Sequence, residues 1–257
     1  MIKFFRKIRQ QLLEENRFSK YFLYAIGEIV LVVVGILIAL QLDNWNENSK
    51  NATKEKEYLY GLQEDLGKQL SLFDDRAVFY DQLIETGESI LTDYTQREKL
   101  LQIDSINKKL SFLLYTNSYP EVNRTFNELN TTGHINLIRE KNLKSDIITY
   151  YLNSESTARK INGNVENVNY NQIFPILKSA IIVNLENFGF PSDNTDQQGL
   201  TKKMASTLEN SLDDPNKEFE IINAISMRII LLKSNELRIQ KIKDEAEELL
   251  STINAKL

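Results

Sequence analysis

The sequence holds few side chains whose type and spacing suit chemistry, and they exclude more reactions than they suggest. It contains one histidine, His134, and no cysteine. Disulfides, thiolate zinc sites, iron–sulfur clusters and thiol catalysis all require cysteine, so they are excluded. A zinc hydrolase needs a second histidine on the same helix face. A serine hydrolase would have to use His134, but no Gly-x-Ser-x-Gly turn precedes a helix. We expect His134, which follows Gly133 in a turn, to have a surface or capping role.

Nucleotide-binding motifs are also absent from the sequence. It has neither the Gly-x-x-x-x-Gly-Lys-Ser/Thr phosphate loop nor Gly-x-Gly-x-x-Gly. Acidic pairs such as Glu247–Glu248 fall on expected helix faces, where carboxylates are ordinarily solvated. Tyr150 and Tyr151 are expected to be the core and the rim of one helix, with a ligand pocket as the alternative. We therefore expect no enzyme, no catalytic residue, no cofactor and no metal.

Glu28 is the only charged residue in the apolar segment 21–42. A helix of this length reaches roughly 33 Å, which is enough to cross the hydrocarbon core of a bilayer. Glu28 would then lie roughly 10 Å deep by helical rise. An ionisable group inside a membrane is costly unless it is paired, so Glu28 is a candidate functional residue.

Small and polar residues share a helix face with Glu28. Alternating steps of three and four residues select Ala25, Glu28, Val32, Gly35 and Ala39. Gly35 and Ala39 form a small-xxx-small pair, which permits close approach of two helices. We predict that this face, here called the small-residue stripe, contacts other transmembrane helices. Two alternatives remain: Glu28 lies near the headgroups and bonds Tyr24 or a lipid, or it transfers protons.

The charge differs on the two sides of the apolar segment. Residues 1–20 carry six basic and two acidic side chains, although the whole chain has a net charge of −5. Basic flanks stay in the cytoplasm, so we expect a cytoplasmic N-terminus and residues 43–257 outside. A cleaved signal peptide is the alternative, but Ile-Ala-Leu-Gln-Leu-Asp at the end of the segment offers no good cleavage site.

The N-terminal segment is amphipathic, and the chain as a whole is acidic. Ile2, Phe5, Ile8 and Leu12 recur at helical spacing with Lys and Arg between them. This pattern predicts either a helix on the cytoplasmic leaflet or an ordinary basic flank. The acidic composition argues against a nucleic-acid partner. The expected partners are the lipid bilayer and other transmembrane helices, in a homo-oligomer or a membrane complex.

The stretch FSKYFLYAIGEIVLVVVGILIALQLDNWNE resembles the N-terminal signature of a large family of single-pass bacterial membrane proteins of unknown function. The matching pattern runs from Lys20 to Glu47 and includes Gly27, Gly35 and Trp45. Residues 125–151 are similar to a second, looser pattern of that family. The resemblance implies a bacterial inner-membrane protein with a periplasmic C-terminal domain, and it implies no activity.

The remaining sequence predicts an all-α domain. Leu59 begins a row of apolar residues at three- and four-residue steps that reaches Ile90, interrupted by Gln69, Arg76 and Gly87. Asp214 and Pro215 form a favoured helix start, and that helix can run to Leu257. We predict an elongated helical bundle whose first and last long helices are antiparallel, with shorter helices beside them.

Some local features of this domain are also predicted. In the last helix, Glu236 interrupts an apolar row that then resumes one residue out of phase. Residues 161–164, Ile-Asn-Gly-Asn, should end a helix, and residues 172–188 should form the core helix. Residues 189–199 should form a loop.

These features favour an accessory or scaffold subunit of a membrane complex. A ligand-sensing module is the alternative, although the roughly 20 residues expected inside leave no room for an output domain, so it would need a membrane partner. A stator-like subunit that couples proton flow through Glu28 is a third hypothesis.

Overall fold

A computed structural model describes residues 18–183 and 195–257. Every regular element in these ranges is a helix and none is a strand, so the predicted all-α class is confirmed. The chain forms two units, Met1–Glu57 and Tyr58–Leu257, which are described separately. The amphipathic pattern predicted for residues 2–12 lies outside the described residues.

Helix α2, Phe18–Arg97, begins in the first unit and continues into the second. It contains no proline, so no backbone donor is lost along its length. In the first unit it carries the apolar segment, whose large side chains are 44% to 72% exposed where they are described. No other helix in the described ranges is long and apolar enough to cross a membrane, although a signal sequence would share these properties.

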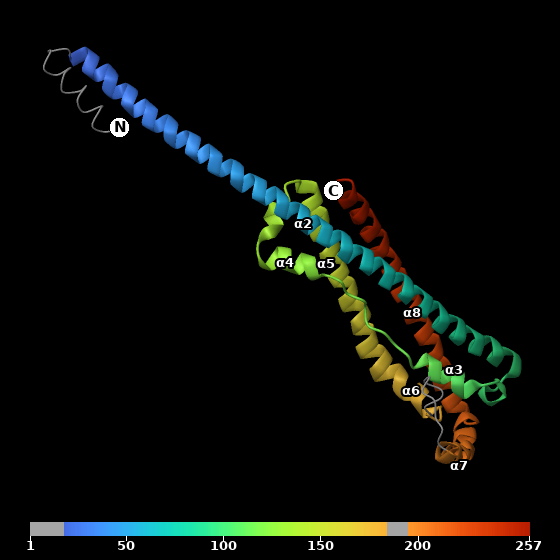
Figure 1. Cartoon of the computed structure of the whole chain (residues 1–257). Coiled ribbons are helices and arrows are strands. Elements are labelled where there is room, and N and C mark those ends of the chain that lie inside the picture. Colours follow the sequence, from blue (N-terminus) through green and yellow to red (C-terminus); the bar gives the residue numbers. More distant parts are fainter. Residues whose placement is uncertain (1–17, 184–194) are drawn as a thin grey trace. The chain divides into compact units, whose positions relative to one another are not determined.

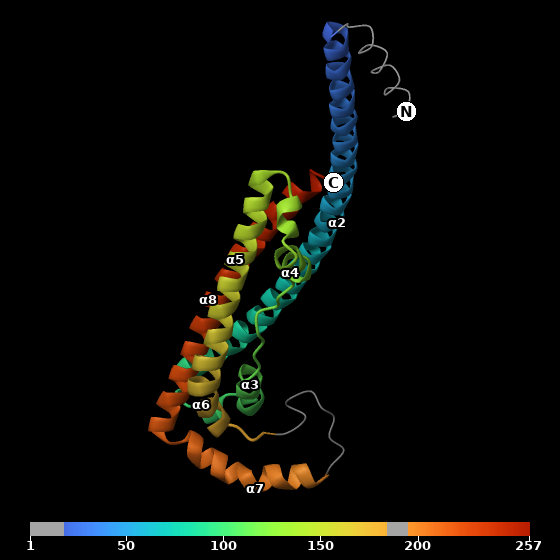
Figure 2. The same ribbon diagram turned by 90° about the vertical axis from the view of Figure 1, so that its left-hand side faces the viewer.

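Three long helical segments form the second unit. They are the part of α2 that follows Glu57, helix α5 (Lys141–Gly163) with the helical turns that continue it to Ser179, and helix α8 (Pro215–Asn254). Figures 1 and 2 both show α5 and α8 side by side. The row of apolar residues predicted on α2 is buried throughout, which confirms it as core: Leu59, Leu62, Leu66, Phe73, Tyr80, Leu83 and Ile90.

Helices α2 and α8 are antiparallel, as predicted. Side-chain bonds link them at three levels, and the residue number on α8 falls as that on α2 rises. These bonds are Gln63–Asn254 (2.7 Å), Asp74–Lys243 (2.6 Å) and Glu88–Lys233 (2.6 Å).

Residues that interrupt the apolar row of α2 have structural roles. Gln69 is 1% exposed, donates to the carbonyl of Pro120 (2.6 Å) and accepts from the amide of Val122 (2.7 Å). It therefore fastens the segment before α4 to the core. At Gly87 a Cβ atom would lie 2.8 Å from Cγ1 of Ile229, so only glycine allows α8 to approach α2 this closely.

Helix α8 begins as predicted but does not change phase. Asp214 caps it by accepting from the amide of Asn216 (2.9 Å), and Pro215 is the first helical residue. A continuous row at three- and four-residue steps is buried: Ile225, Arg228, Leu232, Asn235, Ile239, Ile242, Ala246, Leu249 and Ile253. The expected slip at Glu236 is therefore wrong, because two polar residues occupy core positions in this row.

The expected helix end at residues 161–164 is also wrong. Helix α5 passes at Gly163 into a π-helical segment, η3 (Asn164–Ile173), and then into α6 (Phe174–Ser179). Residues Ile161, Val165, Asn169, Ile173 and Leu177 are all buried at four-residue steps. In an α-helix such a row would turn off the core by about 40° per step. The wider π turns keep the row facing the core.

The expected core helix at residues 172–188 is shorter than predicted. Regular helix ends at Ser179, and Ala180, Ile181 and Ile182 are buried in non-helical conformation. The chain is held there by Asn107, whose side chain bonds both the amide (2.7 Å) and the carbonyl (3.0 Å) of Ile182. Residues 184–194 lie outside the described residues. The predicted loop does not extend to residue 199, because helix α7 begins at Thr195 and ends at Leu212.

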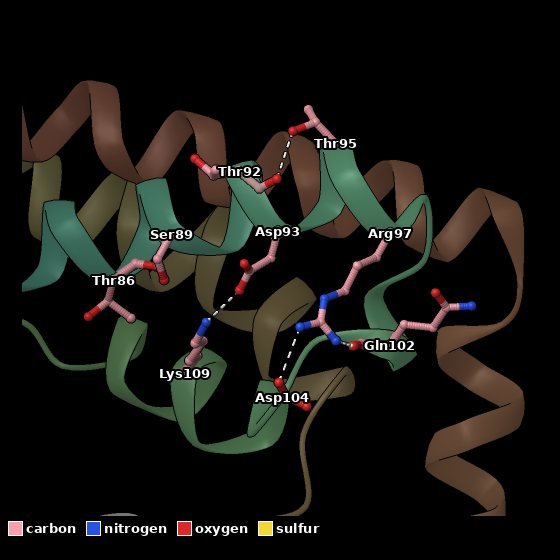
Figure 3. Close-up of polar contacts among 9 residues, drawn as sticks. All are labelled: Thr86, Ser89, Thr92, Asp93, Thr95, Arg97, Gln102, Asp104 and Lys109. Atoms are coloured by element: carbon pink, nitrogen blue, oxygen red, sulfur yellow. Dashed lines mark hydrogen bonds and ion pairs between the residues drawn. The ribbon is translucent and has the colours of Figure 1, made fainter.

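Helix α2 ends at Arg97 in a polar turn, shown in Figure 3. Arg97 donates to the carbonyl of Gln102 and pairs with Asp104 (3.2 Å), and Lys109 pairs with Asp93 (2.8 Å). These bonds hold the short helices η1 (Leu100–Gln102) and α3 (Ile106–Leu113) against the end of α2. An extended stretch then leads to α4 (Arg124–Thr131) and η2 (His134–Leu137).

Candidate functional site

The small-residue stripe lies within helix α2 of the first unit. By the helical period its five members fall within an arc of about 80°. Ala25 and Glu28 are partly buried, whereas Val32 is 55% exposed and Gly35 and Ala39 are exposed. The residues therefore share one face, and whether that face contacts another helix stays a prediction.

The glycines of the apolar segment leave open space beside the helix. A Cβ atom built at Gly35 or at Gly27 would meet nothing within 4 Å in the described part of the chain. Gly27 lies outside the stripe, about 120° around the helix from its middle. The stripe thus offers a second helix a flat surface at Gly35 and a carboxyl group about two turns away at Glu28.

A buried polar layer crosses the second unit, and the sequence analysis did not predict it. Arg228 and Asn235 on α8 are each 3% exposed. Arg228 donates to the carbonyl of Tyr115, and Asn235 accepts from Asn164 at the start of η3 (3.2 Å). The layer therefore fastens α8 to the segment after α3 and to η3 at once.

The electrostatics of this layer are those of a buried cation among neutral groups. Burial lowers the pKa of Arg228 to about 10, and the phenol of Tyr80 opposes that shift. Burial raises the pKa of Tyr80, while Arg76 and Arg228 act in the opposite direction. Among the described residues no carboxylate pairs with Arg228. Burial of a charge costs stability, and a mispaired polar group inside the bundle would cost more still. We therefore predict that the layer favours one register of the helices.

A signal for this layer was present in the sequence. Arg228 and Asn235 are seven residues apart, and each fills a three- or four-residue step between apolar neighbours. A row of apolar residues alone omits both of them, so it divides into two halves that are shifted by one residue.

The comparisons with known proteins identify a family. Residues 28–170, more than half of the chain, match the family of unknown function DUF6090. The chain belongs to DUF6090. The match covers most of the N-terminal stretch that resembled a family of unknown function, and all of residues 125–151. No curated protein and no solved structure matches the chain.

His134 lies in the DUF6090 region and takes part in a contact with α2. The hydroxyl of Tyr58 lies 2.7 Å from Nδ1 of His134 and donates to Oε1 of Glu128 (3.1 Å). Gly133 has φ of 72°, which lets the chain turn between α4 and η2. The side chain of His134 therefore fastens this turn to the start of the second unit.

The tyrosine pair of this DUF6090 member is buried on both sides of α5. Tyr150 is 3% and Tyr151 5% exposed, so the expected rim position of one of them is wrong. Tyr151 stacks on Phe126 of α4, with ring centroids 4.3 Å apart. Tyr151 lines a cavity of about 540 Å³ between α4 and α5, and Tyr150 lines one of about 210 Å³ between α5 and α8. A ligand pocket at the pair, the alternative reading, is compatible with these positions.

Proposed function

We propose that this DUF6090 protein is a non-enzymatic, single-pass membrane protein that serves as an accessory or scaffold subunit of a membrane complex. One observation supports this above the others. The apolar window of α2 has none of its residues buried, although a small-residue stripe containing Glu28 runs along it. A helix of this kind gains most by packing against other helices in a bilayer.

The charge distribution supports one orientation in the membrane. The basic residues 1–20 stay in the cytoplasm of a bacterial inner membrane, and the acidic second unit lies in the periplasm. Alkaline phosphatase fused after Ser49 and after Leu257 should be active in both cases. The full-length chain should also stay in the membrane after alkaline extraction, whereas a cleaved signal sequence would release a shorter chain.

Association through the stripe is tested by paired glycine variants. Gly35→Leu places a bulky side chain on the stripe, and Gly27→Leu makes the same change outside the stripe. Membranes are solubilised gently, and the complex is captured through a C-terminal tag. Gly35→Leu should lose the co-purifying membrane proteins and Gly27→Leu should keep them. Equal retention in both variants would refute the stripe as the contact face.

Self-association is separated by single-cysteine crosslinking, which the cysteine-free chain permits. Val32→Cys lies on the stripe and Val30→Cys on the opposite face. Oxidation in native membranes should give a disulfide-linked dimer only from Val32→Cys if the partner is a second copy. A dimer from neither variant, with a complex still captured, would indicate a different protein as the partner.

A ligand-sensing module is the second candidate, favoured by the two cavities beside α5. A third role, proton transfer through Glu28, makes a distinct demand. Glu28→Gln keeps a hydrogen-bonding group and should preserve association, whereas Glu28→Leu should weaken it. Proton transfer would require both substitutions to be equally damaging in growth, since neither side chain can cycle a proton.

A further inference from the structure

The polar layer around Arg228 contains buried hydrogen-bond donors that meet no acceptor. In the described structure four of its atoms are buried without a hydrogen-bond partner: Nη1 of Arg76 and the hydroxyl of Tyr80 on α2, Nδ2 of Asn169 on η3, and Nε of Arg228 on α8. The three nitrogen atoms can only donate, and the hydroxyl can donate as well. Buried donors are normally satisfied, so the kind of partner that suits this layer is an acceptor.

The Tyr80 hydroxyl lies among the charged groups of the layer. Arg76 and Arg228 both oppose the rise that burial causes in the pKa of Tyr80, so both guanidinium groups lie near the phenol. The phenol of Tyr80 acts in turn on the pKa of each arginine. The donors on α2 and α8 therefore belong to one cluster.

Asn169 reaches the same level of the bundle from η3. Asn164 at the start of η3 bonds Asn235 of α8 (3.2 Å), and the segment that contains α5 and η3 is antiparallel to α8. Five residues further along η3, Asn169 therefore lies within about one turn of Arg228. Tyr170, the next residue, acts on the pKa of Arg228, as this position requires.

The layer carries positive charge that no carboxylate of the described chain offsets. Burial lowers the pKa of both arginines, that of Arg228 to about 10, so Arg228 is still protonated at neutral pH. The side chains that oppose these shifts are phenols, Tyr80 for both arginines and Tyr170 for Arg228. Among the described residues neither guanidinium group forms an ion pair with an acidic side chain. An unpaired buried charge is costly, so the layer would be stabilised by a counter-ion.

These features select a small monovalent anion. A buried water could accept from one or two of the donors, but it would leave the charge uncompensated. Tyr80 and Asn169 are each 2% and Arg228 is 3% exposed, so a bound ion would lose its hydration shell. That loss is far greater for a doubly charged anion such as sulfate than for a halide, because the hydration free energy rises with the square of the charge.

We propose that the polar layer is a binding site for a chloride ion. The ion accepts from Nε of Arg228, Nη1 of Arg76 and the Tyr80 hydroxyl, with Nδ2 of Asn169 as the donor from η3. One ion thereby joins α2, η3 and α8 and offsets the charge of the arginines. The site does not depend on the role proposed for the small-residue stripe, because it lies entirely in the second unit.

Urea unfolding of the full-length protein in detergent micelles tests this proposal with chloride as the probe. Sodium gluconate replaces sodium chloride at constant ionic strength. A ligand that binds only the folded state lowers the unfolding equilibrium constant by the factor 1 + [Cl⁻]/Kd. At physiological ionic strength we expect this constant to be about tenfold lower in chloride than in gluconate. Equal constants in the two salts would overturn the proposal in favour of buried water.

Two tyrosine variants show whether chloride acts at the layer. The hydroxyls of Tyr80 and Tyr150 are both buried without a partner in the described structure, but no guanidinium group acts on the pKa of Tyr150. Tyr80→Phe removes one donor to the ion and should reduce the chloride effect several-fold. Tyr150→Phe is the matched control and should keep the effect in full. An equal chloride effect in the two variants would place the ion elsewhere and overturn the proposal.

Arg228→Met tests the charge itself. This variant should have the same unfolding constant in chloride and in gluconate, whatever its stability, because the main attraction for the anion is gone. Arg159→Met is the control, since Arg159 is an exposed arginine that pairs with Glu155, and it should keep the chloride effect. A chloride effect that survives Arg228→Met would contradict the site. If Arg228→Met does not fold, Tyr80→Phe still decides the question.

Discussion

The contact between α2 and α8 at Gly87 provides the most direct test of the bundle. We expect Gly87→Ala to be destabilising, although alanine is the better helix former. The new Cβ atom would lie 2.8 Å from Cγ1 and 3.0 Å from Cδ1 of Ile229. Cγ1 is not at the free end of the side chain, so the isoleucine cannot clear the space by rotating its tip alone.

The size of the effect follows from a matched control in the same helix. Gly67 is exposed, and a Cβ atom there would meet nothing within 4 Å. Gly67→Ala should therefore raise the free energy of unfolding by about 0.8–1.0 kcal/mol, the helix-propensity difference between the two residues. Overpacking at Gly87 costs about 1–3 kcal/mol. Because the propensity gain is common to both variants, they should differ by about 1–3 kcal/mol.

The assay is urea unfolding of the full-length protein in detergent micelles, followed by near-ultraviolet circular dichroism of the tyrosines. Ile229→Ala completes a double-mutant cycle. Alone it should cost about 2–5 kcal/mol, as deletion of a buried isoleucine side chain does. In its background Gly87→Ala should become stabilising, because the atoms that it would strike are gone. If Gly87→Ala alone stabilises the protein as much as Gly67→Ala does, α8 does not approach α2 at this position and the packing described above is wrong.

Three further predictions concern the second unit. Ile229→Asp should lower the free energy of unfolding by several kcal/mol, because it buries an unpaired charge, and an unchanged thermal midpoint would remove Ile229 from the core. Gln69→Leu should lower the free energy of unfolding, measured in urea, by about 2–4 kcal/mol, because it leaves the carbonyl of Pro120 and the amide of Val122 unsatisfied. Gln63→Leu, at a more exposed side chain, should lower it by less than about 1 kcal/mol. Stability should also fall as pH rises above about 10. Burial raises the pKa of Tyr119, Tyr150 and Tyr151 in the folded state above their pKa in the unfolded chain. The unfolded state therefore loses these protons first, and rising pH favours it. Phenolate absorbance should then show some of the 11 tyrosines ionising only together with unfolding, and reversible titration of all of them near pH 10 in the folded protein would contradict this burial.

Much of the α2 helix could be predicted from the sequence because its signals are local. The apolar row from Leu59 to Ile90 follows the period of one helix, and all seven of its apolar members are buried. The start of α8 at Pro215 was likewise predictable, because a cap bond joins residues two positions apart. The members of the small-residue stripe could be assigned to one face by helical geometry alone. The sequence of the apolar segment does not identify the helix that contacts this face.

The partners of the polar core could not be predicted, because they are distant in the chain. Arg228 bonds a carbonyl 113 positions away, and Asn235 an amide 71 positions away. Sequence periodicity carries no information on such partners. The π-helical segment could not be predicted for a related reason. Gly163 and Asn164 locally favour a helix end, but the packing of the buried row beyond them keeps the chain helical.

By itself the sequence determined the helical class, the apolar segment with Glu28, the face that Glu28 shares with Gly35, and the core row of α2. These follow from composition and from the 3.6-residue period, which act within one helix. Only the tertiary structure decided which polar side chains are buried and where cavities form. The cavity beside Tyr150 is built from Asp146 on α5 and Glu248 on α8, whose separation along the chain hides their proximity. Its acidic walls exist only because the packing of the bundle brings two solvated helix faces together.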